Sequence, residues 1–357
     1  MSVKSFLRDG LESYNSPLCM RKLYIFMLLL FMGLCGHAQV GGKHVYSFLN
    51  LAHGPRQSAL GGKAITLYDY DPSGAILNPA SINKEMHHQV SLNYTSYFAD
   101  VNYGTASYAM QIGNTDHVIH TGVTYINYGT FDGYDETGIF TEKFSGGDVA
   151  LSLGYAYQIA NSDFHIGANA KFISSKLEQY SSLGIAMDIG IIYLAPNSGL
   201  RISAVARNIG TQLKPYHEIY ESLPFEVILG ISNQLENLPL RWHITLDNLQ
   251  QWDIGFSNPN RGQVDLDGTK KEESVSFLNN ALRHMILGVE LFPESTINLR
   301  LGYNFRRGEE LRIEEQRAFA GLNAGFGIKF NSFRVSYAYA KYSAAAASNY
   351  FGLNIDF

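Results

Sequence analysis

Apolar and polar residues alternate along most of the chain from His88 onward. In residues 296–306, Leu299 and Leu301 lie on one face of an extended strand and Asn298 and Arg300 on the other, because successive side chains point to opposite sides. A charged face opposite an apolar face is the inverse of a soluble core, and it is favourable where the apolar face meets lipid. The alternation predicts fourteen strands, at residues 88–98, 102–113, 116–128, 147–160, 163–174, 182–195, 199–209, 224–235, 239–248, 282–293, 296–306, 318–330, 332–342 and 348–357.

The links between these strands alternate in character. Every second link is a short polar turn, such as Asn161-Ser162-Asp163 or Asn331-Ser332. The other set contains the long links, at residues 129–146, 210–223, 249–281 and 307–317. An up-and-down barrel with both ends in the periplasm has short turns on one side and longer loops on the other. We therefore predict an all-β fold, a fourteen-stranded antiparallel transmembrane outer-membrane barrel over residues 88–357.

The last strand, NYFGLNIDF, ends in Phe357. Its alternation alone also suits a soluble sandwich, but the same pattern in the rest of the chain favours the barrel. Bacterial outer-membrane barrels typically end in an aromatic residue that assists recognition by the assembly machinery. We expect Phe357 to serve as this assembly signal.

Residues 39–87 lack the strand pattern and are predicted to form a plug of short helices and turns inside the barrel. Asn78 before Pro79-Ala80 is typical of a capped helical turn, because Asn accepts hydrogen bonds from free amides and Pro fits the first helical position. Gly61-Gly62 after Leu60 can end another turn. A lumen wider than that of an eight-stranded barrel has room for such a plug.

The amino-terminal residues read as a signal peptide. Met20-Arg21-Lys22 is basic and an apolar run follows to Leu34, so residues 20–38 are the expected signal peptide, with cleavage after Ala38. Residues 1–19 are then an upstream extension. A lipoprotein signal at Cys35 is the alternative, but the bulky Leu34 disfavours it. Both cysteines, Cys19 and Cys35, precede the expected cut, so no disulfide framework is expected.

Composition agrees with the barrel and excludes some functions. No apolar run beyond Leu34 approaches the roughly 20 residues of a membrane helix. The 23 Tyr and 21 Phe residues suit strands whose lipid face takes every second side chain. A net charge of −5 argues against a nucleic-acid partner.

Candidate chemistry is sparse. Gly325-Phe326-Gly327 lies within an alternating strand, and the acidic run from Asp265 to Gly268 lacks the spacing of a calcium loop. His87-His88 is more typical of an interfacial pair than of a metal site. No Ser-centred glycine elbow and no His/Ser/Asp grouping stands out. We expect no enzyme activity, no cofactor and no catalytic residue.

The predicted upper loops carry candidate docking residues. Residues 306–317 are rich in both charges, which is typical of a solvated hairpin or of a surface that docks a protein partner or lipopolysaccharide. Aromatic residues in the upper loops resemble binding hot spots. The candidates are Tyr216, Tyr220, Trp252, Phe256, Arg306, Arg307, Arg312 and Arg317.

A family resemblance is concentrated in residues 41–82. Pro55-Arg56, Gly61-Gly62, the acidic Asp69 and Asp71, and Asn78-Pro79-Ala80 together resemble a superfamily of outer-membrane fatty-acid transporters and PorV-like barrels. The opening GGKHVYSFLNLAHGPRQSALGG is more similar to the PorQ family of type IX secretion barrels. The resemblance in architecture extends over the rest of the barrel.

This resemblance implies a non-catalytic outer-membrane component that anchors a surface partner in the complex attaching secreted cargo. The implied partners are outer-membrane lipid, a PorZ-like surface protein that recognises lipopolysaccharide, a sortase-like protease and a PorV-like barrel. The alternative is a transporter of long-chain fatty acids or other hydrophobic compounds, which would need an apolar pocket beside the plug and a lateral opening.

Overall fold

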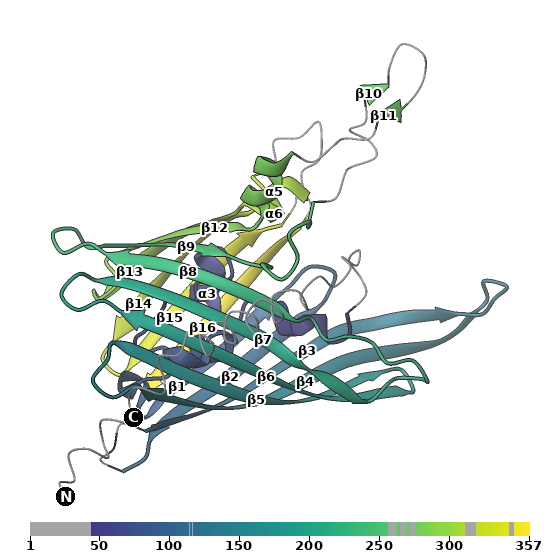
Figure 1. Cartoon of the computed structure of the whole chain (residues 1–357). Helices are drawn as coiled ribbons and strands as arrows, with labels where there is room; N and C mark the ends of the chain where they lie inside the picture. The colour runs from purple at the N-terminus through teal and green to yellow at the C-terminus, as the bar shows by residue number, and fades with distance from the viewer. Residues whose placement is uncertain are drawn as a thin grey trace, which may run out of the picture. The chain divides into compact units, whose positions relative to one another are not determined.

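The computed structural model describes residues 44–113, 115, 117–255, 263–264, 270–271, 276–310, 319–342 and 346–357. The expected extension, signal peptide and cleavage site lie outside these residues. Fourteen strands form one closed antiparallel barrel, in which the last strand pairs with the first (Figure 1). They are β1 (Gln89–Ser96), β2 (Asn102–Gln111), β3 (Val118–Tyr134), β4 (Phe140–Gln158), β5 (Phe164–Leu177), β6 (Tyr180–Leu194), β7 (Leu200–Lys214), β8 (Glu226–Gln234), β9 (Leu240–Leu246), β12 (Met285–Leu291), β13 (Ile297–Asn304), β14 (Leu322–Phe330), β15 (Phe333–Lys341) and β16 (Ala347–Asp356).

The predicted fold class is confirmed, and each predicted strand corresponds to one strand of the barrel. Closure gives every strand two neighbours, so the wall has no open edge where it meets lipid. No helix in the described part of the chain is long and apolar enough to cross a membrane. Two further strands, β10 (Gln263–Val264) and β11 (Lys270–Lys271), pair only with each other.

The two faces of the wall have the polarity that the sequence predicts. In β13, Leu299 and Leu301 are 47% and 53% exposed, whereas Asn298 is fully buried and Arg300 is 3% exposed. Apolar side chains therefore cover the outside and polar ones face the lumen. This arrangement suits a lipid environment, because the outer face buries its apolar area against acyl chains.

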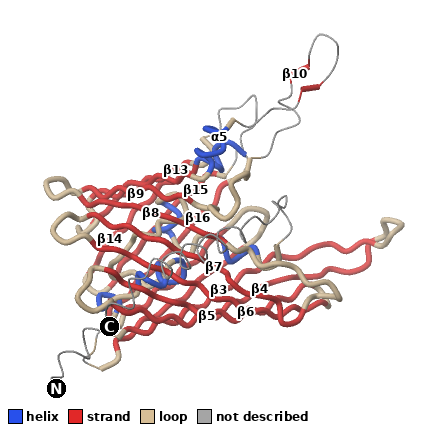
Figure 2. Tube along the Cα trace, viewed as in Figure 1, coloured by secondary structure: helices blue, strands red, loops and turns tan. Residues whose placement is uncertain are grey.

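Residues 44–87, which we call the luminal segment, contain only short helices. These are η2 (Ser47–Asn50), α3 (Pro55–Ala59), α4 (Gly74–Leu77), η3 (Pro79–Ser81) and η4 (Lys84–Met86), shown among the red strands in Figure 2. Inward-facing side chains from well-separated strands hydrogen-bond this segment. The wall partners include Thr105 of β2, Asn169 of β5, Ser203 of β7, His243 of β9, Asn304 of β13 and Asn354 of β16.

Several predicted boundaries differ in the structure, and one is that β7 continues to Lys214, into the link expected at 210–223. Residues 129–146 were expected to form a loop, but β3 and β4 continue through most of them as a paired hairpin. Residues 282–283 belong to a helix, α5 (Phe277–Arg283), so β12 begins later than predicted. A second helix, α6 (Phe305–Glu310), ends β13 early and occupies the start of the link expected at 307–317. α5 is short, with Ser276 as its N-cap, and its seven residues give too few turns for a clear helical period.

Removal of Phe357 tests the assembly signal. Its side chain is 77% exposed, and its backbone N–H donates to the carbonyl of His88 at 3.2 Å. Since the ring packs little in the folded barrel, its loss should affect recognition during assembly more than stability. We expect deletion of Phe357 to lower the amount of folded barrel in the outer-membrane fraction several-fold, measured by heat-modifiable migration on gels. Phe357→Tyr is the control, and unchanged levels after the deletion would contradict the assignment.

Candidate functional site

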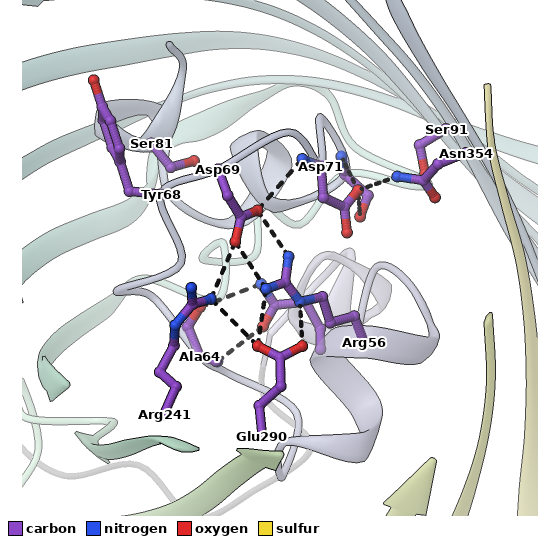
Figure 3. Close-up of polar contacts among 12 residues, drawn as sticks. Arg56, Ala64, Tyr68, Asp69, Asp71, Ser81, Ser91, Arg241, Glu290 and Asn354 are labelled. Carbon is purple, nitrogen blue, oxygen red and sulfur yellow. Dashed lines mark hydrogen bonds and ion pairs between the residues drawn. The ribbon is translucent and has the colours of Figure 1, made fainter. Parts of the chain in front are cut away.

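Arg56 of α3 holds the luminal segment to the barrel wall. Its guanidinium donates to both oxygens of Asp69, at 2.7 and 2.8 Å, and to both oxygens of Glu290 on β12, at 3.1 and 3.0 Å (Figure 3). Arg56 and Glu290 are almost completely buried. The planar fork of arginine matches two carboxylates at once, so this one side chain fixes both the fold of the segment and its position on β12.

Two wall arginines complete this buried network. Arg300 of β13 donates through Nε to Glu290 at 2.9 Å. Arg241 of β9 donates to Asp69 at 3.2 Å and to Glu290 at 3.3 Å, so it contacts the segment and the wall together. Strand alternation turns Arg241, Glu290 and Arg300 into the lumen on adjacent strands. Buried charges are tolerated only when paired, and here each carboxylate has at least two guanidinium partners.

A second buried ion cluster ties the segment to other strands. Lys63 contacts Glu226 of β8 and lies 2.9 Å from Asp247. Arg207 of β7 pairs with Glu226 at 3.4 Å and donates to the carbonyl of Leu49 at 2.9 Å. The segment is therefore attached by charged groups at two separate places on the wall.

The seven motif residues of the luminal segment have identifiable local roles. Pro55 and Arg56 begin α3, and the N–H of Gly62 donates to the carbonyl of Gln57 at 2.8 Å to close it. Gly61 and Gly62 have φ angles of 92° and 110°, which favour glycine. The remaining motif residues, Asn78, Pro79 and Ala80, start η3, where Asn78 Oδ1 accepts from Ala80 N at 3.0 Å.

Inward-facing glycines let the segment approach the wall closely. A Cβ atom at Gly167 of β5 would lie 2.3 Å from the carbonyl oxygen of Pro79. A Cβ atom at Gly302 of β13 would lie 2.3 Å from the N atom of Gly61. Backbone meets backbone at these positions, so a side chain there would displace the segment.

An aromatic cluster lies at the end of the barrel that carries α5. Trp252 stacks on His284, with ring centroids 5.3 Å apart, and packs beside Phe277 at 5.1 Å. His284 contacts the carbonyls of Asp247 and Trp252 at 2.6 and 2.9 Å, so the link after β9 is fixed to the helix. Phe277 is 74% exposed and Trp252 is 49% exposed. This pinned cluster presents a large apolar area outward.

The other docking candidates that the structure describes lie in the link after β7 and in α6. Tyr220 is exposed, whereas Tyr216 is half-buried, its hydroxyl contacts Ser175, and burial raises its pKa to about 12. Arg306 pairs with Glu310 at 2.9 Å. Arg307 is half-buried, and its guanidinium lies 4.5 Å from the ring centre of Tyr342. Phe256, Arg312 and Arg317 lie outside the described residues.

Sequence reasoning missed two parts of this site. Glu290, the centre of the buried network, stands at an inward position of β12, and an acid at such a position was the available signal. Phe277 and neighbouring Leu278 follow Ser276, whose side chain accepts from Asn279 N at 3.3 Å. A serine that can cap a helix, followed directly by two apolar residues, was the sequence signal for this helix. Among the described residues, no three His, Cys, Asp or Glu side chains gather as a metal site requires.

Comparison of the sequence with protein-family models and with curated proteins gives no match. Solved structures with a similar arrangement include a FadL homologue from Pseudomonas aeruginosa, at 10% identity and a TM-score of 0.48, over 85% of this chain and 98% of that chain. The KdgM porin is similar at 8% identity and a TM-score of 0.33, over 75% and 99%. OmpF of Salmonella typhi in complex with daunomycin is similar at 10% and 0.31, over 75% and 96%.

These sequence identities and TM-scores are too low to assign the protein to a class. We therefore assign its class from its own strand pairing and from the polarity of the two faces of its wall. A closed antiparallel barrel with an apolar exterior and a polar interior is the architecture of outer-membrane barrels. The chain is an outer-membrane β-barrel whose lumen holds residues 44–87, tied to the wall by buried ion pairs.

Substitution of Glu290 tests the buried network. Glu290→Gln leaves Arg56, Arg241 and Arg300 without one of their carboxylates in a site that excludes water. We expect the free energy of unfolding to fall by about 3–5 kcal/mol, the cost of leaving a buried charge unpaired. Urea titration of the barrel in detergent measures the change.

Asp132→Asn is the matched control, because Asp132 pairs with Lys143 at 3.3 Å between exposed side chains. An exposed pair contributes under about 1 kcal/mol. Equal effects of the two substitutions would show that the luminal network does not hold the segment.

Proposed function

We propose that this barrel is a non-catalytic anchor of the type IX secretion system, which holds a surface partner in the complex that attaches secreted cargo. The observation that carries the proposal is the aromatic cluster, in which Trp252 and Phe277 are exposed while His284 fixes Trp252 beside the barrel. Exposed aromatic residues on a fixed framework are typical of binding hot spots. The resemblance of residues 41–82 to the PorQ family supports the type IX assignment.

The occupied lumen supports an anchor more than a conduit. The segment and the wall are joined by ion pairs in which each side chain is at most 14% exposed. Moving the segment aside would expose or unpair these charges, which is costly. An anchor needs such rigidity, because immobilising a flexible surface on binding reduces affinity.

The partners in this proposal are a PorZ-like surface protein, a sortase-like protease and a PorV-like barrel. Outer-membrane lipid surrounds the apolar wall, and lipopolysaccharide is a further candidate ligand at the loop end. The aromatic cluster would contact the soluble partner, while the barrel supplies the attachment to the membrane.

A transporter of fatty acids or other hydrophobic compounds is the alternative, because the motifs of residues 41–82 also resemble those of outer-membrane fatty-acid transporters. Transport requires an apolar path beside the luminal segment. Bilayer conductance and fatty-acid uptake by the purified barrel separate the two functions. A recovered barrel that carries fatty acid and conducts would favour transport.

Affinity purification tests the anchor directly. We expect a barrel tagged within residues 129–146 and extracted in detergent to retain a large soluble surface protein together with sortase-like components. The double substitution Trp252→Ser and Phe277→Ser should lower recovery of that surface protein at least about tenfold, since hot-spot aromatics each contribute about 2 kcal/mol or more. Quantitative mass spectrometry measures the recovery.

Phe292→Ser is the control, because Phe292 is also exposed but lies in the short link between β12 and β13. Full recovery with the double variant would remove the aromatic cluster from the interface. Recovery of the barrel without any partner, in the native protein, would overturn the anchor itself.

A further inference from the structure

The hairpin of β3 and β4 continues beyond both neighbouring strands. Pairing of β2 with β3 stops at Asn127, and pairing of β4 with β5 stops at Gly146. Residues 128–145, which we call the ribbon, therefore form a two-stranded sheet whose strands pair only with each other among the described residues. Figure 1 shows this ribbon extending past the other strands.

The two strands of the ribbon are held together by backbone pairing and by contacts between aromatic side chains. Phe131 stacks on Phe144 across the strands, with ring centroids 5.4 Å apart, and Tyr134 meets Phe140 edge-on at 6.1 Å. At the tip, Asp135 accepts hydrogen bonds from the Thr137 hydroxyl and from the N–H of Ile139, and these bonds lower its pKa. Cross-strand aromatic pairs supply the stability that an isolated hairpin otherwise lacks.

The outer edge of β4 has backbone groups with no strand beside them. The carbonyl of Ser145 accepts from the N–H of Glu178, so Ser145 points its backbone groups toward the β5 side. Alternate residues of an antiparallel strand point the same way, so Lys143 also directs its N–H and C=O to that side. No described strand pairs with β4 there, because the β5 pairing ends at Gly146. Such an edge is a template for another strand.

The ribbon also has a marked charge. Its carboxylates are Asp132, Asp135, Glu136 and Glu142, and Lys143 is its one cation, which gives a net charge of −3. Tyr134 and Phe140 are at least half exposed, so aromatic faces lie among the carboxylates. Carboxylates and aromatic faces both attract cationic side chains.

We propose that the free edge of β4 in the ribbon binds an extended, basic segment of a partner polypeptide by strand addition. Main-chain hydrogen bonds to the Lys143 edge would provide register, and the carboxylates and exposed rings would select lysine or arginine at alternate positions. This surface is separate in sequence from the α5 cluster, and the inference does not depend on the proposed secretion role.

Peptide binding to the purified full-length barrel in detergent tests the proposal. The probe is a fluorescein-labelled peptide of about ten residues that alternates valine and lysine, a length typical of one strand. We expect it to bind at least about tenfold more tightly than a peptide alternating valine and glutamate, with the difference shrinking as salt is raised. Fluorescence anisotropy measures both affinities.

The backbone edge is tested by a matched pair of variants. Lys143→Pro removes the N–H on the free edge, whereas Lys143→Ala keeps it and removes the side chain. We expect Lys143→Pro to weaken binding of the lysine peptide about tenfold, and Lys143→Ala to change it by less than about threefold. Heat-modifiable migration confirms that each variant is folded.

A second measurement leaves the protein unchanged. The lysine peptide N-methylated at two adjacent central residues carries one methyl group on each edge, and it should lose binding to the native barrel. Undiminished binding of this peptide, or equal affinity of Lys143→Pro and the native protein, would overturn strand addition. Equal binding of the lysine and glutamate peptides would overturn the basic partner.

Discussion

The ion pairs that Arg56 makes with Glu290 and Asp69 are the interactions on which the arrangement of the lumen depends. In a closed barrel the backbone hydrogen-bonding groups of the strands are paired with one another. The inward-facing arginine and glutamate side chains, however, lie in a space shielded from water. The luminal segment adds one cation, Arg56, and one anion, Asp69, to this group. Asp69 gives Arg241 a second carboxylate and Arg56 gives Glu290 a third guanidinium, so the segment and the wall share one set of buried ion pairs.

The barrel could be predicted from the sequence because it depends on local patterns, whereas the ion pairs of the lumen join residues that are far apart in the chain. Alternation along each strand reports the polarity of its two faces, so the barrel, the number of its strands and its polar interior follow from local sequence. Arg56 and Glu290 are 234 residues apart. No local pattern links them, and only closure of the barrel brings β12 beside α3. The inward positions of Arg241, Glu290 and Arg300 were predictable, whereas their pairing with Arg56 and Asp69 was not.

The loops were harder to predict than the wall because two different effects replaced the expected turns. α5 is a short helix held by tertiary contacts, chiefly Asn280 and His284 with the backbone near Trp252. The ribbon forms because cross-strand aromatic pairs offset the loss of neighbouring strands, although its glycines and acids read as a loop. Tertiary packing decides the structure in both cases, and composition gives little indication of it.

The strands β3 and β4 are longer than crossing a membrane requires. A membrane strand needs roughly 9–11 residues, and β3 and β4 have 17 and 19. The surplus residues extend into water, where an unpaired edge favours aggregation unless it is protected. Asp132 and Glu142 place charge along the ribbon, and like charges discourage pairing between two copies of it. The same carboxylates favour a basic strand at the free edge of β4. One set of charges therefore both discourages self-association of the ribbon and selects its partner.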